Sequence, residues 1–196
     1  MKLNLLSEAT TEPVTVAELR TYLRMGSTDS TSEDVLLTSF ITVARQKAEN
    51  ITRRSLISQT WRLTLDQFPV YDVELPRAAP LSTVSTAVTI TYVEDTTAGT
   101  STTLGSTVYA IDSASIPARV YPAYANDWPS NVRDYDNAVT IQYITGYSTA
   151  PEPVKNWIKM VAADLYENRQ AVTDAQVYRI PRVYVDGMLD DFVVPR

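Results

Sequence analysis

The chain of 196 residues contains no cysteine and no histidine. The missing cysteines exclude disulfide bonds, thiol nucleophiles and cysteine-based zinc sites, and their absence fits a reducing compartment. The missing histidines exclude imidazole as a general base, so an enzyme would have to rely on carboxylates, lysine or tyrosine. We therefore predict a protein that is not an enzyme and that holds no cofactor and no metal.

Long apolar runs are also absent. None approaches the ~20 consecutive apolar residues that a membrane-spanning helix needs, and Met1-Lys2 is not followed by the apolar region of a secretion signal. We expect a protein that remains in a cytosol-like compartment and has no membrane partner. A hydrophobic fraction of 44% and a charged fraction of 20% are ordinary for a globular protein with a packed core.

Basic residues are too few to balance the acidic ones, and the formal net charge is −6. A protein that binds duplex DNA through its phosphates normally carries a basic face. The sequence has only two basic pairs, Arg53-Arg54 and Arg179/Arg182, and solvated surface charge explains both. We therefore expect negligible binding of duplex DNA. The acidity also has a simpler explanation, which is solubility.

Residues 1–57 have a helical pattern. Residues 15–18 (TVAE) have the form of a capping box, in which a hydroxyl and a carboxylate satisfy backbone N–H groups at a helix start. Residues 30–33 (STSE) are a second candidate. An apolar stripe then predicts a long helix from about residue 33 to about residue 53. The stripe consists of Leu37, Phe40, Ile41, Ala44, Ala48 and Ile51.

Residues 58–147 are rich in Thr, Ser, Val and Tyr, with prolines spaced along them. Alternation of apolar and polar residues predicts a small, mostly antiparallel sheet with long loops. The residues around Gly99 and Gly105 read as an exposed hairpin loop. The expected strands cover residues 61–65, 73–75, 84–93, 107–111, 118–121 and 139–144.

Residues 148–171 return to a helical pattern. Pro151 and Pro153 suit a first helical turn, and an apolar stripe from Val154 to Leu165 follows. Helices at the two ends of the chain can bury their stripes against each other. The predicted fold class is α+β, with a helical core of two N-terminal helices plus one late helix, an inserted, mostly antiparallel β section, and an extended C-terminal tail at residues 172–196.

The tail carries apolar residues at the spacing of one helical face, although Gly187 weakens a helix there. Alternatively, residues 193–195 could add to a partner as an edge strand. Either arrangement predicts a partner-binding segment. The competing interpretation is a tail that folds back on its own core. The predicted partner-binding residues are Tyr184, Val185, Met188, Leu189, Phe192, Val193 and Val194.

Tyrosine is the commonest aromatic residue, with twelve copies against three Phe. Tyrosine is enriched in protein interfaces because it tolerates both water and burial. Aromatic residues of the loop-rich β section are therefore candidates for contacts with neighbouring copies or a tail partner. Half-buried strand tyrosines are the alternative. The candidates are Tyr109, Tyr121, Tyr124, Trp128 and Tyr135.

Paired carboxylates are the only candidates for catalysis. A glycosidase needs two carboxylates ~5–9 Å apart across a cleft. Neighbouring acidic residues in polar loops are far more often turn formers or solvated charges, and no spacing resembles an EF-hand. The pairs are Asp134/Asp136, Glu94/Asp95 and Asp190/Asp191.

The order of the segments resembles the head–tail connector (adaptor, or head-completion) proteins of tailed bacteriophages. Local matches are the opening helix at residues 14–24, the stretch LISQTW at residues 56–61 with its strand, and ELPR at residues 74–77. The strand and helix from Ala138 to the YENR run at residues 166–169 also match, as does the short C-terminal segment. Residues 94–137 show no clear family pattern, and Asp190-Asp191 makes the tail more acidic than is usual in the family.

The resemblance implies a structural virion protein without catalytic activity. Such proteins form a ring, usually of twelve copies, below the portal protein, extend the DNA channel and dock the next neck or tail protein, a stopper or tail terminator. DNA passes through without specific binding. The implied location is the virion neck, assembled in the cytoplasm of the bacterial host. The alternative function is a virion receptor- or glycan-binding module, suggested by the Ser/Thr/Tyr-rich sheet.

Overall fold

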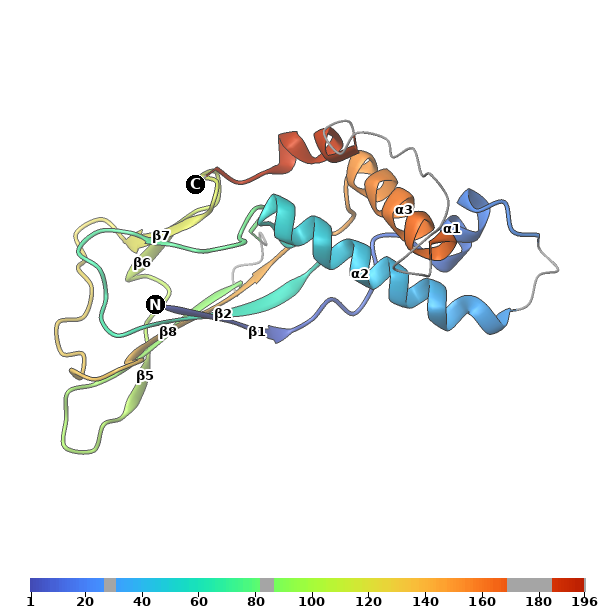
Figure 1. Ribbon diagram of the computed structural model, residues 1–196. Coiled ribbons are helices and arrows are strands. Elements are labelled where there is room, and N and C mark those ends of the chain that lie inside the picture. Colours follow the sequence, from blue (N-terminus) through green and yellow to red (C-terminus); the bar gives the residue numbers. More distant parts are fainter. Residues whose placement is uncertain (27–30, 82–86, 169–184, 196) are drawn as a thin grey trace. The chain divides into compact units, whose positions relative to one another are not determined.

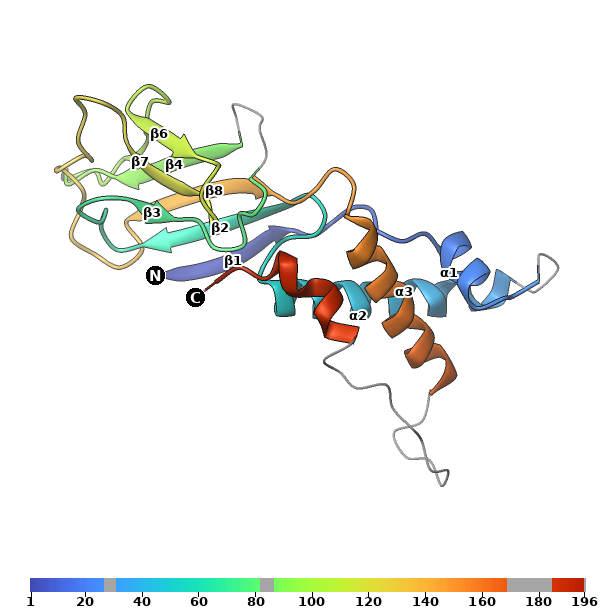
Figure 2. The ribbon, with the colours of Figure 1, turned by 90° about the horizontal axis from the view of Figure 1, so that it is seen from above.

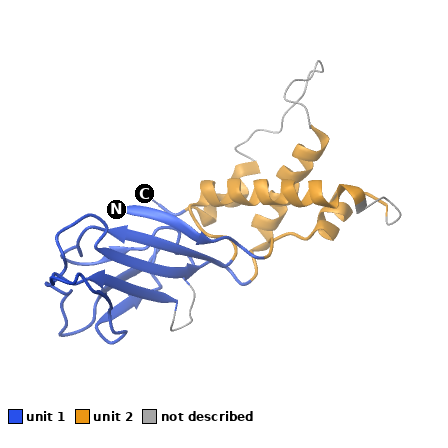
Figure 3. Ribbon diagram, turned by 90° about the horizontal axis from the view of Figure 1, so that it is seen from below, with its two compact units in different colours: residues 1–10, 58–148, 194–196 blue, residues 11–57, 149–193 orange. Residues whose placement is uncertain are grey.

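The computed structural model describes residues 1–26, 31–81, 87–168 and 185–195. The chain forms two compact units (Figure 3). The first, the β unit, consists of Met1–Thr10, Ser58–Ser148 and Val194–Arg196. The second, the helical unit, consists of Thr11–Ile57 and Thr149–Val193. Each unit is therefore built from segments that are distant in sequence.

The helical unit begins at the predicted capping box. The Thr15 hydroxyl accepts from the Glu18 N–H at 3.2 Å, and the Glu18 carboxylate accepts from the Thr15 N–H at 2.7 Å. This last hydrogen bond lowers the pKa of Glu18. At the second candidate, Ser30 lies outside the described residues, and Glu33 is the N-cap of the long helix but its carboxylate accepts from the Tyr166 hydroxyl at 2.7 Å and makes no capping hydrogen bond. The helices are α1 (Val16–Tyr22), η1 (Thr31–Glu33), α2 (Asp34–Thr52), α3 (Glu152–Glu167) and η2 (Gly187–Phe192).

Helices α2 and α3 bury their apolar stripes against each other, and α3 crosses α2 in Figure 2. Leu37 and Ile41 of α2 and Trp157 and Ile158 of α3 are almost fully inaccessible to water. Burial of such large side chains is the main source of stability for helices of this length. The predicted pairing of helices from the two ends of the chain is confirmed.

The β unit contains two antiparallel sheets (Figure 1). The five-stranded sheet has the order β1-β2-β8-β4-β5, and the three-stranded sheet has the order β3-β7-β6. The predicted α+β class is thus confirmed. None of the described helices has the length and hydropathy needed to cross a membrane. The strands are β1 (Lys2–Ser7), β2 (Gln59–Leu65), β3 (Val73–Glu74), β4 (Val88–Val93), β5 (Ser101–Thr103), β6 (Tyr109–Asp112), β7 (Arg119–Pro122) and β8 (Val139–Thr145).

Alternation along the central strand β8 explains the core of the β unit. Val139, Ile141 and Tyr143 are fully buried, whereas Gln142 between them is exposed. Both sheets contribute to one apolar cluster. The Tyr109 hydroxyl donates to the Val88 carbonyl at 2.8 Å and so joins the second sheet to the first.

Two parts of the β unit differ from the sequence-based expectation. Residues 2–7, within the stretch expected to be helical, form the edge strand β1, whose register is set by pairs such as Leu3 with Leu63. The hairpin loop expected after residue 93 contains β5, which pairs with β4. The strand expected to return to β4 is instead β6, which pairs with β7 in the second sheet. Of the three, β1 depends on a partner distant in sequence, which a local pattern does not reveal, whereas β5 and β6 pair with strands close in sequence, β4 and β7.

Candidate partner-binding surfaces

Residues 185–193 of the C-terminal tail belong to the helical unit and pack against its helices. Helix η2 contacts both α2 and α3, and Leu189 is fully buried. Two hydrogen bonds hold the segment: the Trp157 indole N–H donates to the Asp186 carboxylate at 3.2 Å, and the Arg54 guanidinium donates to the Phe192 carbonyl. The tail therefore contributes to the core from Asp186 to Phe192.

The predicted tail residues do not share one exposed face. Val185, Met188 and Phe192 are half-buried, and Val193 is 37% exposed. Val194 is buried, and Tyr184 lies outside the described residues. The predicted spacing assumed an α-helix with 3.6 residues per turn, whereas η2 is a 3₁₀ helix with three residues per turn. The apolar side chains therefore do not lie on one face of the helix. For the described residues, this arrangement corresponds to the alternative in which the tail folds back on its own core.

The candidate aromatic residues of the β unit occupy different environments. Tyr124 is fully exposed, and Tyr121 and Tyr135 are 42% and 46% exposed. Tyr109 is buried, and burial raises the pKa of its hydroxyl. The structure thus leaves three of the four tyrosines accessible to a partner and assigns Tyr109 to the core.

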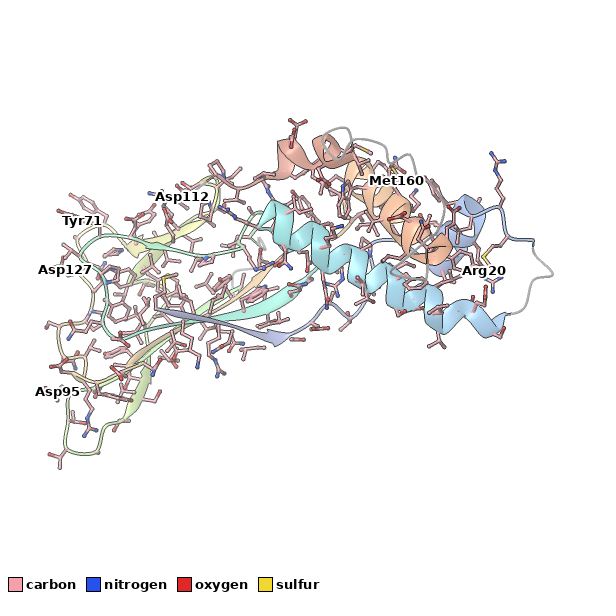
Figure 4. All side chains as sticks on the ribbon, viewed as in Figure 1. Arg20, Tyr71, Asp95, Asp112, Asp127 and Met160 are labelled. Atoms are coloured by element: carbon pink, nitrogen blue, oxygen red, sulfur yellow. The ribbon has the colours of Figure 1, made fainter. Side chains whose placement is uncertain are left out.

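Trp128 is half-buried in the loop before β8. Its ring stacks on Phe68, with centroids 4.7 Å apart and planes 5° apart. Its indole N–H donates to the Tyr71 carbonyl at 2.9 Å, which ties this loop to the loop between β2 and β3. Figure 4 shows Tyr71 and Asp127 at the same end of the β unit. The tryptophan therefore supports a surface that the two loops share.

The sequence analysis missed two exposed apolar residues on this surface. Val70 and Tyr71 are 84% and 79% exposed, in the loop between β2 and β3. Because Val73 pairs with Val120, the loop that precedes β3 lies beside the end of β7, which leads to Tyr124. We call the side chains of Val70, Tyr71 and Tyr124 the aromatic tip. In the sequence, Val70 and Tyr71 form an apolar pair between Pro69 and Asp72, outside any stretch in which apolar and polar residues alternate. This pair is the signal that could have identified them as exposed.

Several carboxylates in the loops of the β unit have structural partners. Asp72 forms an ion pair with Arg119 at 3.0 Å, and Asp134 accepts from the Gln67 amide at 3.2 Å. Glu94 accepts from the Thr102 hydroxyl at 2.8 Å. Within the described part of the chain, no group of three or more Asp, Glu, His or Cys side chains is placed to hold a metal ion. These contacts give the acidic loops a role in ordering the unit.

The buried tyrosine Tyr143 also has a structural role. Its hydroxyl donates to the Pro76 carbonyl at 2.5 Å, and burial raises its pKa far above the ordinary value. Thr145, further along β8, donates to the Pro80 carbonyl at 2.7 Å. Both side chains fix the connection after β3 to the central strand, and neither presents an ionised group at physiological pH.

Three solved structures share this fold over the whole chain. One is described as "Neck of empty GTA particle computed with C6 symmetry", at 24% identity and a TM-score of 0.78. The second is described as "Virion of native gene transfer agent (GTA) particle", at 24% identity and 0.77, and the third as "Neck of native GTA particle computed with C12 symmetry", at 22% and 0.76. Each match covers 100% of this chain and 97% of the other. No protein-family model and no curated protein sequence matches the chain.

Proposed function

We propose that this protein is a structural component of the neck of a phage-type particle, acting as a head–tail connector (adaptor) without enzymatic activity. It forms a ring of twelve copies below the portal protein, extends the DNA channel, and docks the next neck or tail protein. The observation that carries the proposal is the full-length fold match to chains from particle necks, with 97% coverage of those chains.

The extent of the match supports a role that uses the whole chain. A shared fold alone does not imply a shared function. Here, however, both units and the order in which the chain builds them correspond to one neck chain from end to end. The family resemblance in the sequence points independently to the same class of protein.

The ring is supported by the symmetry of the similar particles. Their necks are described with C6 and C12 symmetry, and closed rings arise when identical chains repeat one interface around an axis. A formal charge of −6 on each copy would give such a ring an acidic surface. Like charge repels DNA phosphates and limits non-specific binding. An acidic channel would therefore let DNA pass without being held.

Two surfaces are assigned to partners in this proposal. The C-terminal segment, including the described residues 185–194, binds the portal, either through its outward side or after leaving its docked position. The aromatic tip contacts a neighbouring copy or the next neck protein. The exposed Tyr121 and Tyr135 belong to the same proposed surface. Exposed tyrosines suit such contacts because their rings bury apolar area while the hydroxyl stays hydrogen-bonded.

Labelling of intact particles tests the proposal. Antibody-coated gold directed at this chain should mark the junction of head and tail, and quantitative mass spectrometry should find it in the same copy number as the portal protein. Gold at the distal end of the tail would instead favour the receptor- or glycan-binding module. Absence of the chain from purified particles would refute a neck role outright.

A further inference from the structure

Every charged side chain of α2 is engaged within the helical unit. A surface helix usually places its charged residues on the face opposite the core. In α2, Arg45 and Glu49 are buried, whereas Asp34 is half-buried and Lys47 is exposed, and all four contact other residues of the same unit. The contacts are Asp34 with Arg20 at 2.7 Å, Arg45 with Glu12 at 2.8 Å and with Glu49 at 2.9 Å, and Lys47 with the Trp157 ring at 5.9 Å from its centroid.

The outward side of α2 includes an uncharged sector, which is bordered by the exposed Lys47. At 3.6 residues per turn, five exposed residues fall within a sector of about 80° and along roughly 22 Å of the helix. Val35 and Val43 are 82% and 49% exposed, which is unusual for two valines on one helix face. We call this surface the outer face of α2; it consists of Val35, Ser39, Val43, Gln46 and Asn50.

The hydroxyl groups on and beside this face are already hydrogen-bonded. Ser39 donates to the Leu36 carbonyl at 2.7 Å, and Thr38 donates to the Asp34 carbonyl at 2.7 Å. Covering a hydroxyl that keeps its hydrogen bond avoids most of the cost of burying a polar group. Ser39 is also small and lies between the two valines, so another helix can approach closely there. The face is therefore suited to burial.

We propose that the outer face of α2 packs against a second copy of this chain, as one side of the interface that repeats around the ring. The inference rests on the proposed ring. In a ring, one face of each copy contacts a different face of the next copy. Each copy therefore needs two interface surfaces, one for each neighbour. A continuous uncharged face on the longest helix meets the requirement of an interface core, where charged residues are depleted.

The absence of cysteine allows a direct test. Val43→Cys puts one thiol midway along the length of the outer face, and Asn156→Cys puts one at an exposed position of α3, next to the Lys155–Glu152 ion pair. Each variant is probed with a maleimide reagent, once free and once assembled on purified portal rings. The thiol of Val43→Cys should react at least about tenfold more slowly after assembly, because it reacts only during the fraction of time that the interface is open. The thiol of Asn156→Cys should react equally in both states.

A maleimide–benzophenone cross-linker, which couples to the thiol and on irradiation inserts into C–H bonds of any neighbouring chain, identifies the occupant. In assembled rings, the Val43→Cys variant should give a product of two copies of the 21.8 kDa chain. Adducts only with the portal, unchanged reactivity of the Val43→Cys thiol, or equal protection of the thiols in both variants would each overturn the inference. Failure of the wild-type chain to join portal rings would refute the proposed function instead. Rings that form while the thiol of Val43→Cys stays reactive would refute the α2 interface alone.

Discussion

Truncation of Leu189 tests whether the tail is part of the core. The side chain is fully buried in the helical unit, where η2 contacts α2 and α3. Leu→Ala substitutions in well-packed cores cost about 2–5 kcal/mol, because apolar contacts are lost and a cavity remains. Leu189→Ala should therefore lower the free energy of unfolding by an amount in this range, unless the segment undocks first.

Undocking of the tail sets an upper limit to the measured loss of stability. If η2 leaves the helices before they unfold, Leu189→Ala lowers global stability only by the free energy of docking. The Val193 N–H, which donates to the Asp190 carbonyl at 3.2 Å, reports this local opening through its rate of hydrogen exchange. In the variant that amide should exchange faster, whether or not the global transition moves.

Urea unfolding followed by circular dichroism at 222 nm measures the helical unit. Val193→Ala is the matched control, because its side chain is 37% exposed and surface substitutions usually change stability by less than ~0.5 kcal/mol. The reasoning would be refuted if Leu189→Ala left both the urea midpoint and the exchange of the Val193 amide unchanged. That result would mean that the tail is not docked in the free protein.

Four further predictions concern other parts of the chain. Arg45→Met should cost about 3–5 kcal/mol in urea unfolding, because it removes the cation that faces a buried carboxylate, and adding Glu49→Leu should restore part of the loss. Thr15→Ala should cost about 1 kcal/mol through loss of the α1 cap. Burial raises the pKa of Tyr143, so the folded state retains a proton that the unfolded chain releases near pH 10. Stability should thus be complete below about pH 10 and fall as pH rises further, and less steeply in Tyr143→Phe. Gel-shift assays near physiological salt should show negligible binding of duplex DNA.

Each of these predictions has a control or a contradicting result. For the alkaline effect, the fully exposed Tyr124 supplies the control Tyr124→Phe, which should leave the pH profile unchanged. An Arg45→Met variant as stable as the wild type would show that the buried ion pairs do not form in solution. A Thr15→Ala variant of unchanged stability would mean that the α1 start frays without cost. Tight DNA binding would contradict the role assigned to the acidic surface.

The helices and the central strands were predictable because their signals are local. The capping box of α1, the stripe of α2 and the alternation along β8 each lie within one short window of sequence. The edge strands β1 and β5 were not predictable, since β1 shows little alternation and β5 has three residues, Ser101–Thr103. The conformation of β1 follows from pairing with β2, which is distant in sequence, and that of β5 from pairing with the preceding strand β4.

The candidate surfaces were predictable only in part. Composition and position suggested four tyrosines of the β section as partner contacts; Tyr121, Tyr124 and Tyr135 are exposed, whereas the Tyr109 hydroxyl reaches across to the Val88 carbonyl. The tail was singled out by its apolar spacing, yet burial of Leu189 depends on the helical turn that the segment adopts. Residue type indicates which side chains can serve a surface, whereas the tertiary fold decides which of them face the solvent.

Imaging of this protein mixed with purified portal rings of the same virus tests the central claim most directly. Native mass and negative-stain micrographs should show a second ring stacked below each portal, with twelve copies of the chain per complex. Monomers that associate neither with the portal nor with tail proteins would contradict the connector account. The chain would then share only its fold with the chains of particle necks.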